Sequence, residues 1–99
     1  MCGAPVQTLD LEGIDVAKES IVQGTVVRDG APVAGAYVRL LDSTGEFTAE
    51  VQTSAAGNFR FFAAPGDWTL RTLTTGGGST DASATAVQGE VVELTITVQ

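Results

Sequence analysis

The sequence predicts a small all-β protein, a single antiparallel sandwich of seven strands with a flexible N-terminal arm. Short runs of alternating apolar and polar residues recur roughly every ten residues, and Gly, Pro, Asp and Asn turns separate them. No window after Ser20 keeps the apolar spacing of a helix. A chain of 99 residues has room for one domain, which we divide into an arm over residues 1–20 and a sandwich over residues 21–99.

The first three strands are predicted from side-chain alternation. Residues 21–28 are rich in β-branched side chains and end at an Asp-Gly turn signal. Residues 36–41 alternate Ala, Val and Leu with Tyr, Arg and Leu. In residues 46–53, Phe47 is predicted to face the core while the glutamates face solvent.

The next three strands complete the predicted core. Residues 59–62 place Phe59 inward, residues 68–74 do the same with Trp68, and residues 90–98 have an apolar face of Val, Leu and Ile. Phe62 has the opposite alternation, for which we favour a β-bulge over simple exposure or a partner-binding patch.

The segment from Thr75 to Gly89 is predicted to be a mobile loop. It is rich in Gly, Ser, Thr and Ala and begins with three consecutive glycines, which have high chain entropy and no side chains to pack. A weak seventh strand is predicted within it, over residues 84–88.

Composition excludes several classes of function. The chain has no histidine, so the common Ser-His-Asp, Cys-His and histidine-based zinc sites cannot form, and we predict that it is not an enzyme. Its net charge of −7 disfavours binding to nucleic acid or anionic membranes. A single cysteine requires no oxidising compartment, and no export or membrane segment is visible, so a cytoplasmic location is expected.

Three motifs resemble the carboxypeptidase regulatory-like, or prealbumin-like, superfamily. They are a V-x-G-x-V strand, a G-x-P-x-x-G-A-x-V-x-L strand and a G-x-F-x-F hairpin, within residues 21–27, 30–40 and 56–61. Domains of this superfamily are small seven-stranded sandwiches, so the resemblance implies the same fold over Ile21 to Leu73.

A closer resemblance extends over nearly the whole chain. The segments 1–5, 38–43, 46–51 and 59–71 are similar to an actinobacterial family of proteins of unknown function, DUF1416. Its members are short cytosolic proteins, commonly encoded beside a rhodanese-type thiosulfate sulfurtransferase and described as sulfur-metabolism proteins. The resemblance therefore implies a sulfur-related setting, with that sulfurtransferase as the candidate partner.

Cys2 is a candidate sulfur-carrying thiol. Removal of Met1 would leave an α-amine and a thiol on one residue, and the ammonium would lower the pKa of the thiol. Cys2 could then accept a sulfane sulfur as a persulfide; the alternatives are an ordinary thiol and, less favoured, a soft-metal ligand. No other metal site and no cofactor are predicted.

The arginines are the second candidate site. Arg28, Arg39, Arg60 and Arg71 are predicted to point outward from strands, where Glu46, Glu50 and Glu93 could pair with them. The alternative is an anion or partner surface, in which Arg39, Arg60 and Arg71 converge with Tyr37. The Asp42–Glu46 segment is interpreted as a polar hairpin and not as a calcium loop.

The leading functional hypothesis is a non-catalytic accessory or binding module linked to sulfur metabolism. It would dock on a thiosulfate sulfurtransferase through an exposed strand edge or its acidic outer face. The alternatives are a persulfide carrier that uses Cys2, and a small-ligand or protein-binding sandwich unrelated to sulfur.

Overall fold

The described part of the chain is a sandwich of two β-sheets. The computed structural model describes residues 20–74 and 78–98, and within these ranges it contains strands only. The strands are β1 (Ile21–Arg28), β2 (Ala31–Pro32), β3 (Tyr37–Leu41), β4 (Phe47–Gln52), β5 (Asn58–Phe62), β6 (Gly66–Leu73), β7 (Ser79–Ala86) and β8 (Val91–Thr97). The predicted all-β sandwich is confirmed; the predicted arm lies outside the described residues, except for Ser20.

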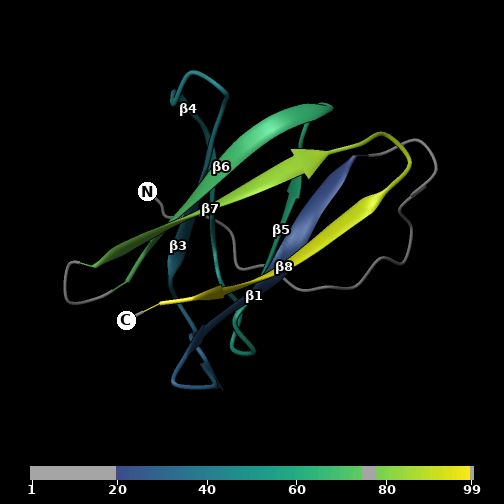
Figure 1. Ribbon diagram of the computed structural model, residues 1–99. Coiled ribbons are helices and arrows are strands. Elements are labelled where there is room, and N and C mark those ends of the chain that lie inside the picture. Colours follow the sequence, from purple (N-terminus) through teal and green to yellow (C-terminus); the bar gives the residue numbers. More distant parts are fainter. Residues whose placement is uncertain (1–19, 75–77, 99) are drawn as a thin grey trace.

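The two sheets are named here after their central strands. In the β1 sheet, β1 pairs with β2, β5 and β8; the β3 sheet has the order β4-β3-β6-β7. Figure 1 shows β8 running alongside β1, with β6 and β7 in the other layer. No helix that could cross a membrane is found in residues 20–74 and 78–98.

One strand pair departs from the antiparallel prediction. β8 runs parallel to β1, in continuous register from Ile21↔Val91 to Val27↔Thr97. Parallel neighbours need a long crossover between them. The chain between β1 and β8 provides it, because that chain forms β2 and β5 of the same sheet and all four strands of the other sheet before it returns to β1.

The core lies between the sheets and uses alternate residues of each strand. Val22 and Val26 of β1 are fully buried, as are Val38 of β3 and Leu70 of β6. Phe59, which is also fully buried, packs near Phe61 with ring centroids 6.2 Å apart. Trp68, predicted as core, is partly buried and packs against this cluster.

The predicted mobile loop is largely a strand. β7 occupies residues 79–86 and pairs with β6 over all eight of its residues, from Gly66↔Ala86 to Leu73↔Ser79. The strand begins five residues earlier than the predicted seventh strand. Its inward positions are threonine and alanine, so the alternation is real but its apolar contrast is weak.

Two phenylalanines differ from their predicted positions. Phe47 is 61% exposed, because a register shift between Leu40 and Leu41 places Phe47 opposite Leu41. Phe62 is 55% exposed and pairs with Ile21 in the same unbroken register as the rest of β5. The predicted bulge at Phe62 is therefore wrong, and simple exposure is the outcome.

A buried threonine fixes the entry to β3. The Thr53 hydroxyl accepts a hydrogen bond from the Ala36 N–H at 2.9 Å and donates to the Val33 carbonyl at 2.7 Å. The Thr53 N–H also donates to the Ala36 carbonyl, at 2.8 Å. These bonds hold the chain next to Tyr37, the first residue of β3.

Gly24 is required by the packing around β1. A Cβ atom at this position would lie 1.8 Å from the Leu94 carbonyl oxygen and 3.0 Å from the Phe59 ring. Because the carbonyl oxygen belongs to the backbone of β8, no side-chain rotation can relieve that overlap.

We expect Gly24→Ala to lower the free energy of unfolding by about 3 kcal/mol, because β8 must shift away from β1. Gly78→Ala is the matched control: its Cβ would meet only the Thr74 hydroxyl, at 3.6 Å, and should cost less than about 0.5 kcal/mol. Urea unfolding measures both. Equal stability of the two variants would contradict the packing described for Gly24.

We expect Thr53→Val to cost about 2 kcal/mol, since it leaves the Ala36 N–H and the Val33 carbonyl without their hydroxyl partner. Thr53→Ser keeps the hydroxyl and loses one methyl group, at a cost of about 1 kcal/mol. Thermal unfolding at neutral pH compares them. A Thr53→Val variant as stable as Thr53→Ser would show that the hydroxyl is dispensable.

Candidate functional site

Four charged residues form one row across the outer surface of the β3 sheet. Arg39 of β3 lies opposite Glu50 of β4 on one side and opposite Arg71 of β6 on the other. Arg71 in turn lies opposite Asp81 of β7. The order across the four strands is therefore acid, arginine, arginine, acid.

Each arginine is paired with the acid on its outer side. Arg39 Nε lies 2.8 Å from Glu50 Oε2. Arg71 donates two bonds to Asp81, from Nε at 2.9 Å and from Nη2 at 3.1 Å. Two like charges on opposite strands repel each other, and these two carboxylates offset that repulsion.

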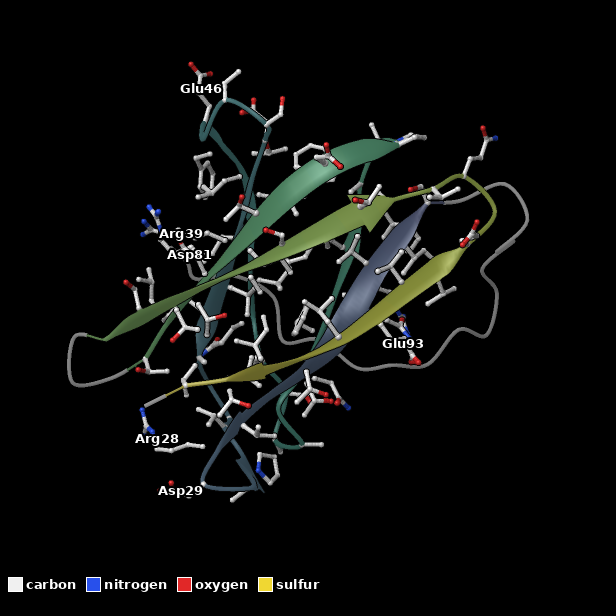
Figure 2. All side chains as sticks on the ribbon, viewed as in Figure 1. Arg28, Asp29, Arg39, Glu46, Asp81 and Glu93 are labelled. Atoms are coloured by element: carbon white, nitrogen blue, oxygen red, sulfur yellow. The ribbon has the colours of Figure 1, made fainter. Side chains whose placement is uncertain are left out.

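The ion pairs leave the arginine side chains accessible. The side chains of Arg39 and Arg71 are 46% and 45% exposed. Figure 2 labels Arg39 on β3 and Asp81 on β7, which overlap in this view; Arg71 of β6 lies between them in the row. The hydrogen bonds from Arg71 lower the pKa of the Asp81 carboxyl, and Asp81 raises the pKa of Arg71.

Tyr37 extends this surface by one row. It precedes Arg39 by two residues on β3, so the two side chains share a face of the sheet. Tyr37 is 36% exposed. We call the surface formed by Tyr37, Arg39 and Arg71 with their flanking acids the arginine face; it contains three of the four residues predicted to converge.

Arg60 does not join the arginine face. It lies on β5 in the other sheet and is only 6% exposed. Its Nε donates to Gln23 Oε1 at 2.9 Å, and Gln23 Nε2 donates to Glu93 Oε1 at 3.2 Å. Gln23 thus links Arg60 to Glu93, because β1 lies between β5 and β8.

The predicted ion pairs are partly realised. Arg39 pairs with Glu50 as predicted, whereas the partner of Arg71 is Asp81, which falls in the segment predicted as a loop. The missed signal was the alternation of Asp81 with Ser79 and Ser83, which places all three on one face of a strand.

The polar hairpin before β4 uses a carboxylate to hold its own turn. Asp42 Oδ1 accepts bonds from the N–H and hydroxyl of Thr44, at 2.9 and 2.6 Å, and from the Glu46 N–H at 3.0 Å. These bonds lower the pKa of Asp42, the Thr44 hydroxyl contributing most. Residues 20–74 and 78–98 hold no group of three His, Cys, Asp or Glu placed to bind a metal, and Cys2 lies outside them.

Two surface cavities accompany these features. One, of about 340 Å³, lies over β6 and β7 and is lined by Ser43, Asp67, Trp68, Thr69, Ser83, Ala84 and Thr85. The other, of about 250 Å³, lies between β1 and β8 and is lined by Gly24, Thr25, Glu93, Leu94 and Thr95. Both are open to solvent and lined mainly by polar atoms.

The sequence has clear relatives. The family model described as "Protein of unknown function (DUF1416)" matches residues 2–98. Two uncharacterized proteins of Mycobacterium tuberculosis (strain ATCC 25618 / H37Rv) are each 58% identical over 79 residues, which cover 78% of this chain and 79% of theirs. An uncharacterized protein of Mycolicibacterium smegmatis is 58% identical over 66 residues, covering 66% of this chain and 73% of its own.

Solved structures share the fold at low sequence identity. The Bacillus anthracis TIE protein matches with a TM-score of 0.68 at 17% identity, over 80% of this chain and 16% of its own. BcpA, the major pilin subunit of Bacillus cereus, matches with a TM-score of 0.62 at 17% identity, over 82% of this chain and 30% of its own. The dioxygenase domain of a Streptomyces sp. SirexAA-E fusion protein matches with a TM-score of 0.62 at 12% identity, over 98% of this chain and 90% of its own.

We expect Asp81→Asn to make stability less sensitive to acid. The pKa of Asp81 in the folded protein lies below its ordinary value of 3.8, so its ion pair stabilises the fold above that value. This contribution disappears as the pH falls through the lowered pKa. Between about pH 5 and pH 2 the variant should therefore lose less stability than the wild type in urea unfolding.

Glu46→Gln removes one negative charge outside the row and serves as the control, since it should retain the acid sensitivity of the wild type. Identical pH profiles for Asp81→Asn and the wild type would show that the Arg71–Asp81 pair does not stabilise the fold.

Proposed function

The chain belongs to the DUF1416 family of proteins of unknown function, and from that premise we propose that it is a non-catalytic binding module that docks on a thiosulfate sulfurtransferase. The observation that carries the proposal is the arginine face, on which Tyr37, Arg39 and Arg71 lie together. Tyrosine and arginine are enriched at the centres of protein interfaces.

The arginine face has the chemistry of a contact surface. Its two arginine side chains are about half exposed, and each is held by a carboxylate, so little side-chain freedom remains to be lost on docking. Phe47 of β4 adds exposed apolar surface beside this face. It lies opposite Leu41, which follows Arg39 by two residues on β3. An aromatic and arginine surface of this kind favours a protein partner over a small anion, whose charge the flanking acids would repel.

The choice of partner comes from the sequence resemblance to the DUF1416 family, whose members are commonly encoded beside a rhodanese-type sulfurtransferase. The persulfide-carrier alternative concerns the same partner. In that reaction the Cys2 thiolate would take the outer sulfur of the partner's cysteine persulfide and leave a thiolate on the partner. Cys2→Ser separates the two hypotheses, because it would abolish carriage and leave docking unchanged.

We expect the full chain to bind the sulfurtransferase in isothermal titration calorimetry. Tyr37→Ala should raise the dissociation constant at least about tenfold, because it removes the aromatic side chain of the arginine face. Phe62→Ala removes a more exposed ring, 55% against 36% for Tyr37, from the other sheet, and it should change the dissociation constant less than about twofold.

Absence of a binding signal, with the wild type folded, would refute docking on this partner. Equal weakening by Tyr37→Ala and Phe62→Ala would place the interface elsewhere. If Cys2→Ser abolishes the gain of one sulfur atom by the chain after incubation with loaded sulfurtransferase, the carrier hypothesis replaces the accessory one.

A further inference from the structure

β7 is a long and regular edge strand. It pairs only with β6, so the backbone N–H and C=O groups on its other side have no strand partner in the described part of the chain. Its register with β6 is unbroken over eight residues, whereas the β4 edge carries a register shift. Roughly every second residue of such an edge directs its backbone groups outward, where another strand can bind them.

β7 lacks the features that normally protect an edge. It contains no proline and no lysine, and its one charged residue, Asp81, is held by Arg71. Its side chains are Ser, Thr, Ala and Asp, which leave room for larger side chains on an added strand. The backbone of β7 is therefore open to pairing.

A cavity beside β7 indicates which side chain an added strand would carry. The cavity of about 340 Å³ has hydroxyl groups from Ser83 and Thr85 of β7 and one carboxylate, Asp67, but no cationic lining residue. Asp67 Oδ1 accepts a hydrogen bond from the Thr85 hydroxyl at 2.9 Å, which fixes the carboxylate at the cavity. A carboxylate among hydroxyl groups is suited to an ammonium or guanidinium group.

We propose that β7 binds an extended segment of a partner protein as an additional strand of the β3 sheet, with a Lys or Arg side chain of that segment in the cavity beside Asp67. In this mode of binding, backbone hydrogen bonds provide affinity and side-chain pockets provide specificity. The inference rests on the proposed role as a protein-binding module and adds the site and the chemical class of the bound segment.

Charge favours such a segment over a second copy of this chain. Each copy carries a net charge of −7, and neither β7 nor β8, the adjacent edge strand of the other sheet, contains a basic residue. Pairing two copies through β7 would bring the acids of both strands together. A basic segment meets the opposite charge.

The experiment selects peptides with the full-length chain. A pool of blocked eight-residue peptides, matching the length of β7 and varied at every position without Cys or Pro, is passed over the immobilised protein. We expect the retained peptides to be enriched in Lys or Arg at one position and in β-branched residues at alternating positions. In fluorescence anisotropy, N-methylation of alternate backbone amides should weaken the best peptide at least about tenfold.

Variants locate the site. Ser83→Lys puts a cation at the cavity and should weaken the selected peptide at least about tenfold, while Ser83→Ala should change its binding less than about twofold. Thr48→Lys, at an exposed position on the opposite edge strand, is the matched control and should have no effect. A second peptide carries Gln in place of the basic residue. Asp67→Asn should weaken binding of the basic peptide more than binding of the Gln peptide.

The proposal is overturned if no basic position is enriched, if binding survives Ser83→Lys, or if Thr48→Lys is equally disruptive. Sedimentation of the protein provides a further check. A dimer that Ser83→Lys dissociates would mean that β7 pairs with a second copy of the chain, and this result would also overturn the proposal. The selection uses no sulfurtransferase. Loss of the sulfurtransferase interaction with peptide selection intact would therefore reject the proposed partner alone.

Discussion

The contact of β1 with its two long neighbours is the constraint on which the rest of the structure depends. At Gly24 the carbonyl of Leu94 and the ring of Phe59 both approach so closely that a single methyl group would displace them. β1 lies between β5 and β8, and the last strand returns parallel to the first. The remaining long strands, β3, β4, β6 and β7, build the second sheet. The arginine face is the outer surface of that second sheet.

Most of the fold could be predicted from the sequence because its strands combine β-branched or aromatic residues with clear alternation. β7 could not, since its inner face holds only alanine and threonine, with no large apolar side chain to mark a buried strand. Its place is determined by eight pairings with β6, which are contacts between residues distant in sequence. Phe47 was misassigned for a related reason: a register shift depends on two strands and has no signature in one.

The candidate site divides along the same line. Alternation correctly placed Tyr37 and Arg39 on one face of β3, a property of a single strand. Whether Arg71 or Arg60 lies beside them depends on which strands are neighbours, and strand order cannot be derived from spacing alone. The sheet order brings Arg71 to Arg39 and assigns Arg60 to the other sheet, where Gln23 binds it.

The charge row on the β3 sheet also determines what a distant molecule experiences. Negative ends and a positive middle form a linear quadrupole with no net charge, and its field decays more steeply than that of a dipole. Beyond a Debye length of about 8 Å, an approaching molecule responds to the acidic excess of the chain, whose net charge is −7, and not to the two arginines. Encounter is therefore governed by the global charge, and the arginines act only once surfaces touch.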